Sequence, residues 1–349
     1  MKKDIRKIIL VQLSKKEQIR VADIIETTGF SRAYINRFFQ GLRRDGKIAL
    51  IGKANQAFYV LSKNKDKAKK DILSVRTFLK NNNLSEDIVL KKVKTNNGIF
   101  LDLPSNIINI FDYAFTEMLN NAIEHSLSKN ITVLVQRHEN ELRFEVLDFG
   151  IGIFKNIMQK KKLQNTMNAI QDLLKGKQTT NSKEHSGEGI FFTSKLADKM
   201  IIFGSNKKLI FDNAIGDVFI QDSARSIGTK IVFEISLDNK KTLQDVFNAY
   251  SGEKFSFDKT RVIVDLFALD ALYVSRSQAK RVLVDLDKFK EVILDFKNVQ
   301  TIGQGFADEI FRVWQKKHPE IKIECENTGD NVLFMIKRSR STIGDKNVQ

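Results

Sequence analysis

The stretch EMLNNAIEH, residues 117–125, decides the fold of this chain. At 3.6 residues per turn, Glu117 and Asn121 lie one turn apart on the same face of a helix. A carboxamide oxygen is a hard ligand suited to Mg²⁺, and a neighbouring carboxylate can orient or deprotonate a nucleophile. The pair alone is weak evidence, because most such pairs are solvated helix surface. Apolar residues at the same period supply the buried side of the helix: Phe111, Ala114, Phe115, Met118 and Ala122.

Three glycine-containing motifs follow the helix. Asp148–Gly152 (DFGIG) comes after the strand-like run Leu142–Leu147, and Ser186–Ile190 (SGEGI) opens a helical stretch from Phe191 to Met200. Gly228–Phe233 (GTKIVF) is a turn into a strand. The order Glu-x-x-x-Asn, Asp-x-Gly-x-Gly, Gly-x-Gly, Gly-Thr resembles the ATP-binding domain of the GHKL (Bergerat-fold) superfamily. This superfamily includes gyrase, histidine kinases and the anti-sigma serine kinases.

The resemblance implies a role for each polar residue. Asn121 would hold the Mg²⁺ that bridges the ATP phosphates, and Glu117 would act as base, on water in an ATPase or on a protein hydroxyl in a kinase. Asp148 would accept a hydrogen bond from the adenine amino group, because an ionised carboxylate is only an acceptor. Thr229 would add a hydroxyl near the adenine.

The glycines have implied roles too. Gly150 and Gly152 would let the backbone approach the nucleotide, because glycine has no Cβ. Gly187 and Gly189, with Ser186 before them, precede a helix whose positive end would face phosphate oxygens.

Competing motif readings are poorer. Asp148–Gly150 also spells the magnesium triplet of eukaryotic-type protein kinases, but no His-Arg-Asp loop or strand lysine motif accompanies it. Gly176–Thr179 resembles the end of a P-loop, but the upstream glycine is missing and Gln178 separates the lysine from the threonine. A zinc role for His125 lacks nearby His or Cys at ligand spacing.

The lysine-rich stretch 155–185 occupies the position of the family's lid over the nucleotide. Its apolar residues at helical spacing (Leu163, Met167, Ile170, Leu173 and Leu174) indicate packing. Thr179, Thr180 and Ser182 would touch phosphates or lie in a solvated loop.

Residues 1–63 predict three helices and a hairpin. The helices end near Ser14, span Val21–Thr27 and span Arg32–Arg44, with Ser31 as an N-cap; the strands are Ile48–Ile51 and Ala57–Leu61. This order resembles a bacterial winged helix-turn-helix, whose third helix enters the DNA major groove. A protein-binding role is the alternative, because fold does not fix function. The expected DNA contacts are Ser31, Arg32, Tyr34, Asn36, Arg37 and, at the wing tip, Lys53 with Asn55.

Residues 256–340 repeat an α/β rhythm, with strands at 261–265, 292–295 and 321–325 and helices at 275–288 and 305–316. They resemble the STAS-like domain often found after GHKL modules. In anti-sigma antagonists a phosphoacceptor serine follows the central strand, but here that turn, Thr301–Gly305, has none. Thr301 is off register, and Ser275 and Ser277 are alternatives, although Ser275 also suits a helix cap. Asp308, Glu309 and Arg312 are expected on an exposed face, where they would be solvated or pair with the basic lid.

Composition bounds the class of protein. The net charge is +16 over 349 residues, and residues 1–65 hold 15 Lys and Arg against 5 Asp and Glu, which favours nucleic acid as a partner. Cys325 is the one cysteine, and no apolar stretch approaches 18 residues, so we expect a cytoplasmic protein without a membrane partner. The predicted fold class is α/β (α+β) multidomain: a winged helix (1–63), a Bergerat-fold α/β sandwich (64–238) and a STAS-like α/β domain (239–349).

These features predict a cytosolic regulator in which binding and slow hydrolysis of ATP with Mg²⁺ switch a DNA-binding winged helix and a STAS-like domain that contacts a protein partner. One alternative is an anti-sigma-type Ser/Thr kinase acting on its own or a partner's STAS domain. Another is a scaffold that binds ATP without catalysis. A sensor histidine kinase is disfavoured, since no dimerising helix with a phosphoacceptor histidine precedes the ATP domain. A homodimer is compatible with the resemblance, because relatives commonly dimerise.

Overall fold

The N-terminal part forms a small unit with its own core. The computed structural model describes residues 4–51, 57–66, 73–95, 98–176, 188–251, 257–267 and 273–341. Helices α1 to α3 enclose a cluster that includes Ile9, Ile35 and Phe39, and β1 pairs antiparallel with β2. The order of elements is the one expected from the sequence: α1 (Ile5–Lys15), α2 (Val21–Thr28), α3 (Arg32–Arg44), β1 (Ile48–Ile51), β2 (Phe58–Leu61) and the 3₁₀ turn η2 (Ser62–Asn64).

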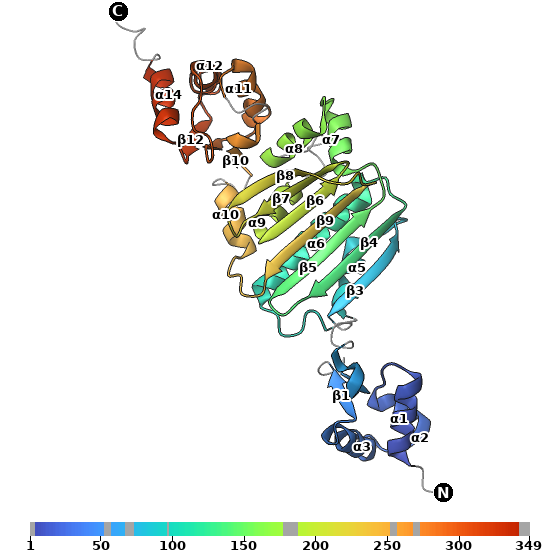
Figure 1. Ribbon diagram of the computed structural model, residues 1–349. Coiled ribbons are helices and arrows are strands. Elements are labelled where there is room, and N and C mark those ends of the chain that lie inside the picture. The colour runs from blue at the N-terminus through green and yellow to red at the C-terminus, as the bar shows by residue number, and fades with distance from the viewer. Residues whose placement is uncertain are drawn as a thin grey trace, which may run out of the picture.

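The central part is an antiparallel sheet with the strand order β3-β4-β5-β9-β6-β7-β8 (Figure 1). Strand β9 is inserted between β5 and β6, so the start of β9 lies beside the end of β5, with Leu147 opposite Lys230. This crossover is what brings two distant motifs together. The strands are β3 (Ser74–Lys80), β4 (Asn130–Arg137), β5 (Glu141–Asp148), β6 (Lys199–Gly204), β7 (Lys207–Asp212), β8 (Asp217–Asp222) and β9 (Thr229–Ser236).

One face of this sheet is covered by helices. Burial alternates strictly along β5 and β6, which is typical of an antiparallel sheet with one face packed and the other toward water. On the open face Arg143 bonds Glu234 at 2.8 Å. The long helix α6 packs on β5 and β9, and the other helices pack on α6 or on each other. This layer consists of α5 (Glu86–Thr95), α6 (Ser105–His125), α9 (Gly189–Leu196) and α10 (Leu243–Tyr250).

The lysine-rich stretch begins with two helices, α7 (Ile153–Lys161) and α8 (Thr166–Lys175). Ile170 and Leu173 are buried, which confirms that the apolar residues of this stretch serve packing. Thr179, Thr180 and Ser182 lie outside the described residues.

The helix expected from Phe191 to Met200 is shorter than predicted. It ends at Leu196, because Ala197 takes an extended conformation (ψ 153°). Met200 then lies in β6, where Met200 and Ile202 are buried with a period of two.

The C-terminal part contains a parallel sheet of order β10-β11-β12. The helix expected over 275–288 ends at Leu283, since Val284 leaves the helical conformation (ψ 131°) and Asp285 is left-handed (φ 62°). Cys325 on β12 is partly buried, and burial raises the pKa of its thiol to about 11. The elements are β10 (Lys259–Ile263), η3 (Val264–Phe267), α11 (Arg276–Leu283), η4 (Leu286–Lys288), β11 (Glu291–Asp295), α12 (Gln304–Asp308), η5 (Glu309–Trp314), α13 (Gln315–Lys317), β12 (Lys322–Glu326) and α14 (Asp330–Ser341).

The prediction that Asp308 and Glu309 lie on an exposed helix face is wrong. Both are 8% exposed, and Asp308 accepts hydrogen bonds from Arg312 and Arg276. The bond from Arg312 holds the pKa of Asp308 below its usual value. The reason is that helices α11 and α14 both pack against this stretch, so that Arg276 and Lys280 of α11 reach the two carboxylates.

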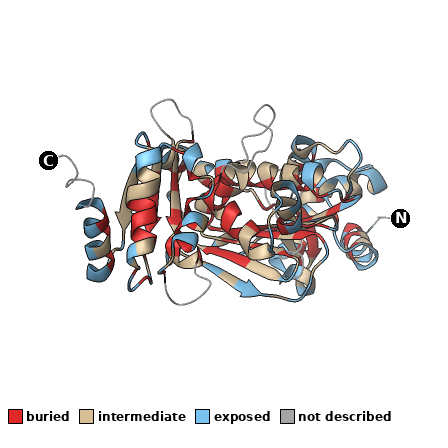
Figure 2. Ribbon diagram, turned by 90° about the horizontal axis from the view of Figure 1, so that it is seen from above, coloured by how far each residue is buried: buried red, intermediate tan, exposed pale blue. Residues whose placement is uncertain are grey.

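The three parts follow one another along the molecule. In Figure 1 the N-terminal unit lies beyond β3, and the C-terminal part lies near α8 and α10. One continuous hydrophobic cluster runs from the central part into the C-terminal part, and Figure 2 colours its buried residues red. The α/β multidomain fold class is confirmed. Among the described residues, no helix is both long and apolar enough to span a bilayer.

Candidate functional site

Asp148 and Thr229 meet where β5 ends and β9 begins. Asp148 continues the buried alternation of β5, and Thr229 continues that of β9, so both point to the helix-covered face. The Asp148 carboxylate accepts hydrogen bonds from the Gly150 N–H (2.9 Å) and from the backbone and hydroxyl of Thr229. Burial raises the pKa of Asp148, and these three bonds oppose that rise. The result is a carboxylate fixed in one orientation.

Three loops pack closely around this carboxylate. The Ile151 N–H donates to the Ser126 carbonyl at 2.8 Å, which ties the loop after β5 to the end of α6. A Cβ on Gly150 would lie 1.7 Å from that same carbonyl oxygen. A Cβ on Gly228 would lie 2.1 Å from the Asp148 carbonyl oxygen, and Gly228 has a φ of +74°. These glycines are therefore required by loop packing, a reason that the sequence alone did not give.

Gly152 and Thr229 position helix α7. Gly152 has a φ of +83° and immediately precedes the helix, whose first amide, Ile153 N–H, donates to the Thr229 hydroxyl at 2.9 Å. Asn156, in the first turn, donates from Nδ2 to the His125 carbonyl at 3.0 Å. The hydroxyl of Thr229 thus bridges Asp148 and the start of α7.

Glu117 and Asn121 lie on α6, and both are partly buried. Gly189, the first residue of α9, packs against Glu117, since a Cβ there would lie 2.0 Å from Glu117 Oε2. Two residues near this contact, Tyr113 and Glu188, were not identified as site residues from the sequence. Burial raises the pKa of Tyr113, and the charges of Glu117 and Glu188 raise it further, so this phenol stays protonated beside two carboxylates. Tyr113 precedes Glu117 by one helical turn, a signal that could have found it.

Two further residues missing from the sequence prediction support the site. Ser128 Oγ accepts from the Phe149 N–H at 3.0 Å, and the Ser126 hydroxyl donates to the Ala122 carbonyl. The first bond joins the segment after α6 to the loop after β5, and the second lies within the end of α6. Ser186 and Gly187, which the sequence placed at this site, lie outside the described residues.

The predicted DNA contacts are placed by α3. The Ser31 hydroxyl caps this helix by accepting from the Tyr34 N–H at 3.3 Å. Ser31, Arg32, Tyr34 and Arg37 are exposed, and Asn36 is partly exposed. Lys53 and Asn55 lie outside the described residues.

The serines considered as phosphoacceptors are engaged in local structure. Ser275 is the N-cap of α11, accepting from the Gln278 N–H at 3.2 Å, and its hydroxyl bonds that of Ser277 at 2.9 Å. Within the described ranges, no group of three or more His, Cys, Asp or Glu residues is arranged to hold a metal ion.

Comparisons with known proteins assign two of the three parts. Residues 96–210 match the family model of the histidine kinase-like ATPase domain, and residues 278–333 match that of a STAS-like domain of unknown function (DUF4325). No curated protein matches the chain. Among solved structures, the crystal structure of the Thermotoga maritima IclR aligns over 81% of this chain and 96% of its own, at 12% identity and a TM-score of 0.14, too slight a likeness to support an argument. The chain therefore carries a histidine kinase-like ATPase domain, which implies ATP binding, followed by a STAS-like domain, which suggests protein interaction.

Proposed function

We propose that this protein is an ATP-dependent regulator whose nucleotide site lies between α6, the loop after β5 and the start of α9. The observation that carries the proposal is the fixed Asp148 carboxylate, buried and aligned by three donors. Such a group fits an amino donor such as that of adenine, because a carboxylate accepts hydrogen bonds and the protein sets its orientation before binding. Asp148, Thr229, Gly150 and Gly152 would hold the base.

The polar residues of α6 supply the rest of the site. Asn121 would ligate Mg²⁺, which supplies charge neutralisation of the phosphates when bound. Glu117, one turn earlier, would accept the proton of an attacking water or hydroxyl. Gly189 and the first turn of α9 would face the phosphates, because backbone N–H groups at a helix N-terminus favour anions.

The first test uses γ-labelled ATP with Mg²⁺ on the full chain, comparing wild type with Glu117→Ala and Asn121→Ala. Glu124→Ala is the matched control, since it removes a carboxylate from an exposed position of the same helix. Free labelled phosphate, lost in the first two variants and kept in the control, is the expected result. Label retained on protein would instead identify a kinase. Absence of ATP binding by the wild type would overturn the proposal.

The outputs of the proposed switch are the two flanking parts. The net charge of residues 1–65 and the exposed Arg32 and Arg37 of α3 support DNA binding through residues 1–63. ATP can switch this binding only if it favours one arrangement of the chain over another. Duplex DNA affinity measured with and without a non-hydrolysable ATP analogue tests this; equal affinity would remove the coupling.

A further inference from the structure

A buried lysine at the end of α8 forms hydrogen bonds with the STAS-like domain. Lys175, the last residue of α8, is 3% exposed, and its Nζ donates to the carbonyls of Arg281 (2.9 Å) and Val284 (2.8 Å). These carbonyls belong to the C-terminal end of α11, where the helix leaves acceptors without intrahelical partners. The Lys175 ammonium supplies hydrogen-bond donors to two of these acceptors. Lys175 therefore caps a helix of the neighbouring domain.

Other polar contacts fix the same docking. Gln171 on α8 donates from Nε2 to the Leu266 carbonyl at 2.9 Å, and the Thr260 hydroxyl donates to the Lys175 carbonyl at 2.8 Å. Lys161 on α7 lies 3.2 Å from a carboxylate oxygen of Asp285. Gln171 and Thr260 are buried, so breaking these hydrogen bonds would leave their polar groups unpaired unless water reached them.

Helix α9 touches both the proposed nucleotide site and the STAS-like part. Its first residue, Gly189, abuts Glu117, and two residues later the ring of Phe191 lies 4.6 Å from that of Phe257. There is no room for even a methyl group between Gly189 and the Glu117 carboxylate. Phosphates placed between Glu117 and the start of α9 therefore displace the Glu117 carboxylate, the start of α9 or both.

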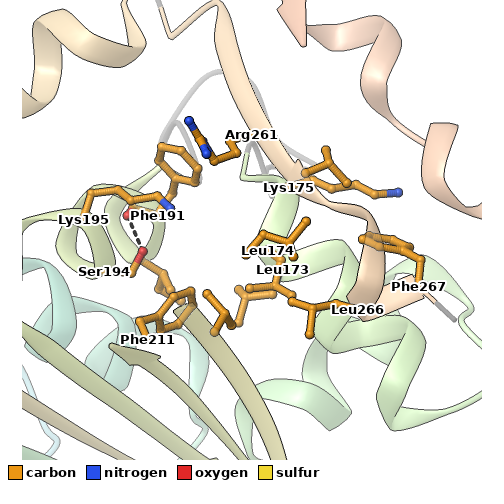
Figure 3. A pocket seen from close by; sticks show the side chains of 14 residues that line it. Leu173, Leu174, Lys175, Phe191, Ser194, Lys195, Phe211, Arg261, Leu266 and Phe267 are labelled. Atoms are coloured by element: carbon orange, nitrogen blue, oxygen red, sulfur yellow. Dashed lines mark hydrogen bonds between the residues drawn. The ribbon is translucent and has the colours of Figure 1, made fainter. Parts of the chain in front are cut away.

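The junction also carries features that oppose docking. A cavity of about 20 Å³, roughly the space of one water, lies between α8, α9 and β10 (Figure 3). Lys195 and Arg261 both line it, and burial lowers the pKa of Lys195 to about 8, with the charge of Arg261 adding to the effect. In Figure 3 the ammonium of Lys175 points away from this cavity. Lys175 thus holds together a junction that contains a void and, in Lys195, a lysine whose charge burial disfavours.

We propose that the STAS-like domain is a built-in inhibitor of the nucleotide site, and that Lys175 is the positioning residue that keeps α8 and α9 in the closed, docked arrangement. This inference rests on the proposed function. Nucleotide binding moves α9 away from Glu117 and weakens docking, so docking must in turn weaken nucleotide binding, because coupling between two equilibria is reciprocal. A partner that captures the undocked STAS-like domain raises the affinity of the chain for nucleotide.

The test measures two quantities on the full chain: affinity for an ATP analogue with Mg²⁺, and amide hydrogen exchange in residues 276–284. In the wild type, the analogue speeds exchange in α11. Lys175→Met keeps side-chain length and removes both hydrogen bonds to α11. It speeds exchange without nucleotide and tightens nucleotide binding about tenfold, because a larger fraction of molecules is competent to bind. Lys297→Met is the matched control, since Lys297 pairs with Asp217 across the same two domains at a partly exposed position, and it behaves as wild type.

Two results overturn the inference: nucleotide binding that leaves α11 exchange unchanged or slower in the wild type, or unchanged or weaker nucleotide affinity in Lys175→Met. If Lys175→Met melts at a much lower temperature than wild type, Thr260→Val replaces it, because it removes one donor to α8 with little change in volume; a change of affinity in the same direction is then required. Failure of the wild type to bind nucleotide at all refutes the proposed function, and the inference with it.

Discussion

Replacing Gly189 by alanine should separate the stability of the protein from its catalysis. The new Cβ would lie 2.0 Å from Glu117 Oε2, whereas real Cβ contacts are essentially never under 3.0 Å. The carboxylate must therefore move by at least about 1 Å, and a displacement of that size in a catalytic group costs on the order of 100-fold in rate. The group that moves is the end of a flexible side chain, so we expect the free energy of unfolding to stay within about 1 kcal/mol of wild type.

The assay is ATP hydrolysis at saturating nucleotide, with urea denaturation measured on the same preparations. Glu117→Gln sets the activity expected when the base is absent. Gly41→Ala is the control for a glycine-to-alanine change in a helix, since its added Cβ meets nothing within 4 Å. A folded Gly189→Ala protein that hydrolyses ATP at the wild-type rate would refute the role of Glu117 as a positioned base.

Four further outcomes are expected. Gly228→Ala should lower the free energy of unfolding, measured by urea denaturation, by about 3 kcal/mol, because its Cβ would clash with the Asp148 backbone. Gly216→Ala, also at positive φ but in open space, should lower it by about 1 kcal/mol. Equal losses of stability would contradict the packing argument. Asp148→Asn should weaken ATP binding about tenfold or more by calorimetry and reduce the preference for ATP over GTP, because an amide cannot accept through both of its polar atoms. Burial lowers the pKa of Lys175 to about 8, so the unfolded chain binds more protons than the folded chain from pH 8 to 10. The free energy of unfolding of the wild type should therefore rise across that window by up to about 1.4 kcal/mol per pH unit more than that of Lys175→Met. Identical slopes for the two proteins would contradict the lowered pKa of Lys175. Arg37→Ala should lower affinity for duplex DNA and reduce the slope of log affinity against log salt by about 1 in fluorescence anisotropy, while an unaltered slope would exclude a phosphate contact.

The local elements could be predicted because their signals are local. Helix α3 begins and ends at the predicted residues, because Ser31 supplies the cap and Ile35, Phe39 and Leu42 repeat at helical spacing. The order of motifs likewise predicted the ATPase domain, and the family comparison agrees. The assignment of individual site residues to ATP and Mg²⁺ stays a prediction.

The long-range contacts could not be predicted. Position 150 must be glycine because the Ser126 carbonyl, 24 positions earlier, leaves no room for a Cβ. No pattern in either segment indicates that the two are in contact. Lys175 belongs to a stretch that sequence reasoning placed over the nucleotide, yet its ammonium caps a helix more than 100 positions away. Such partners depend on how the parts pack, and a charged residue has no periodic pattern that reveals its burial.

The state of Cys325 has a practical consequence for studying these motions. It is the one thiol of the chain, and with a pKa of about 11 it is almost entirely protonated at neutral pH. Only the thiolate reacts quickly with maleimides, and an exposed cysteine has a pKa near 8.5. A cysteine introduced on the surface of α11 would therefore be labelled ahead of Cys325 in the otherwise native sequence. Fluorescent reporters of domain separation can thus be attached without first removing the natural cysteine.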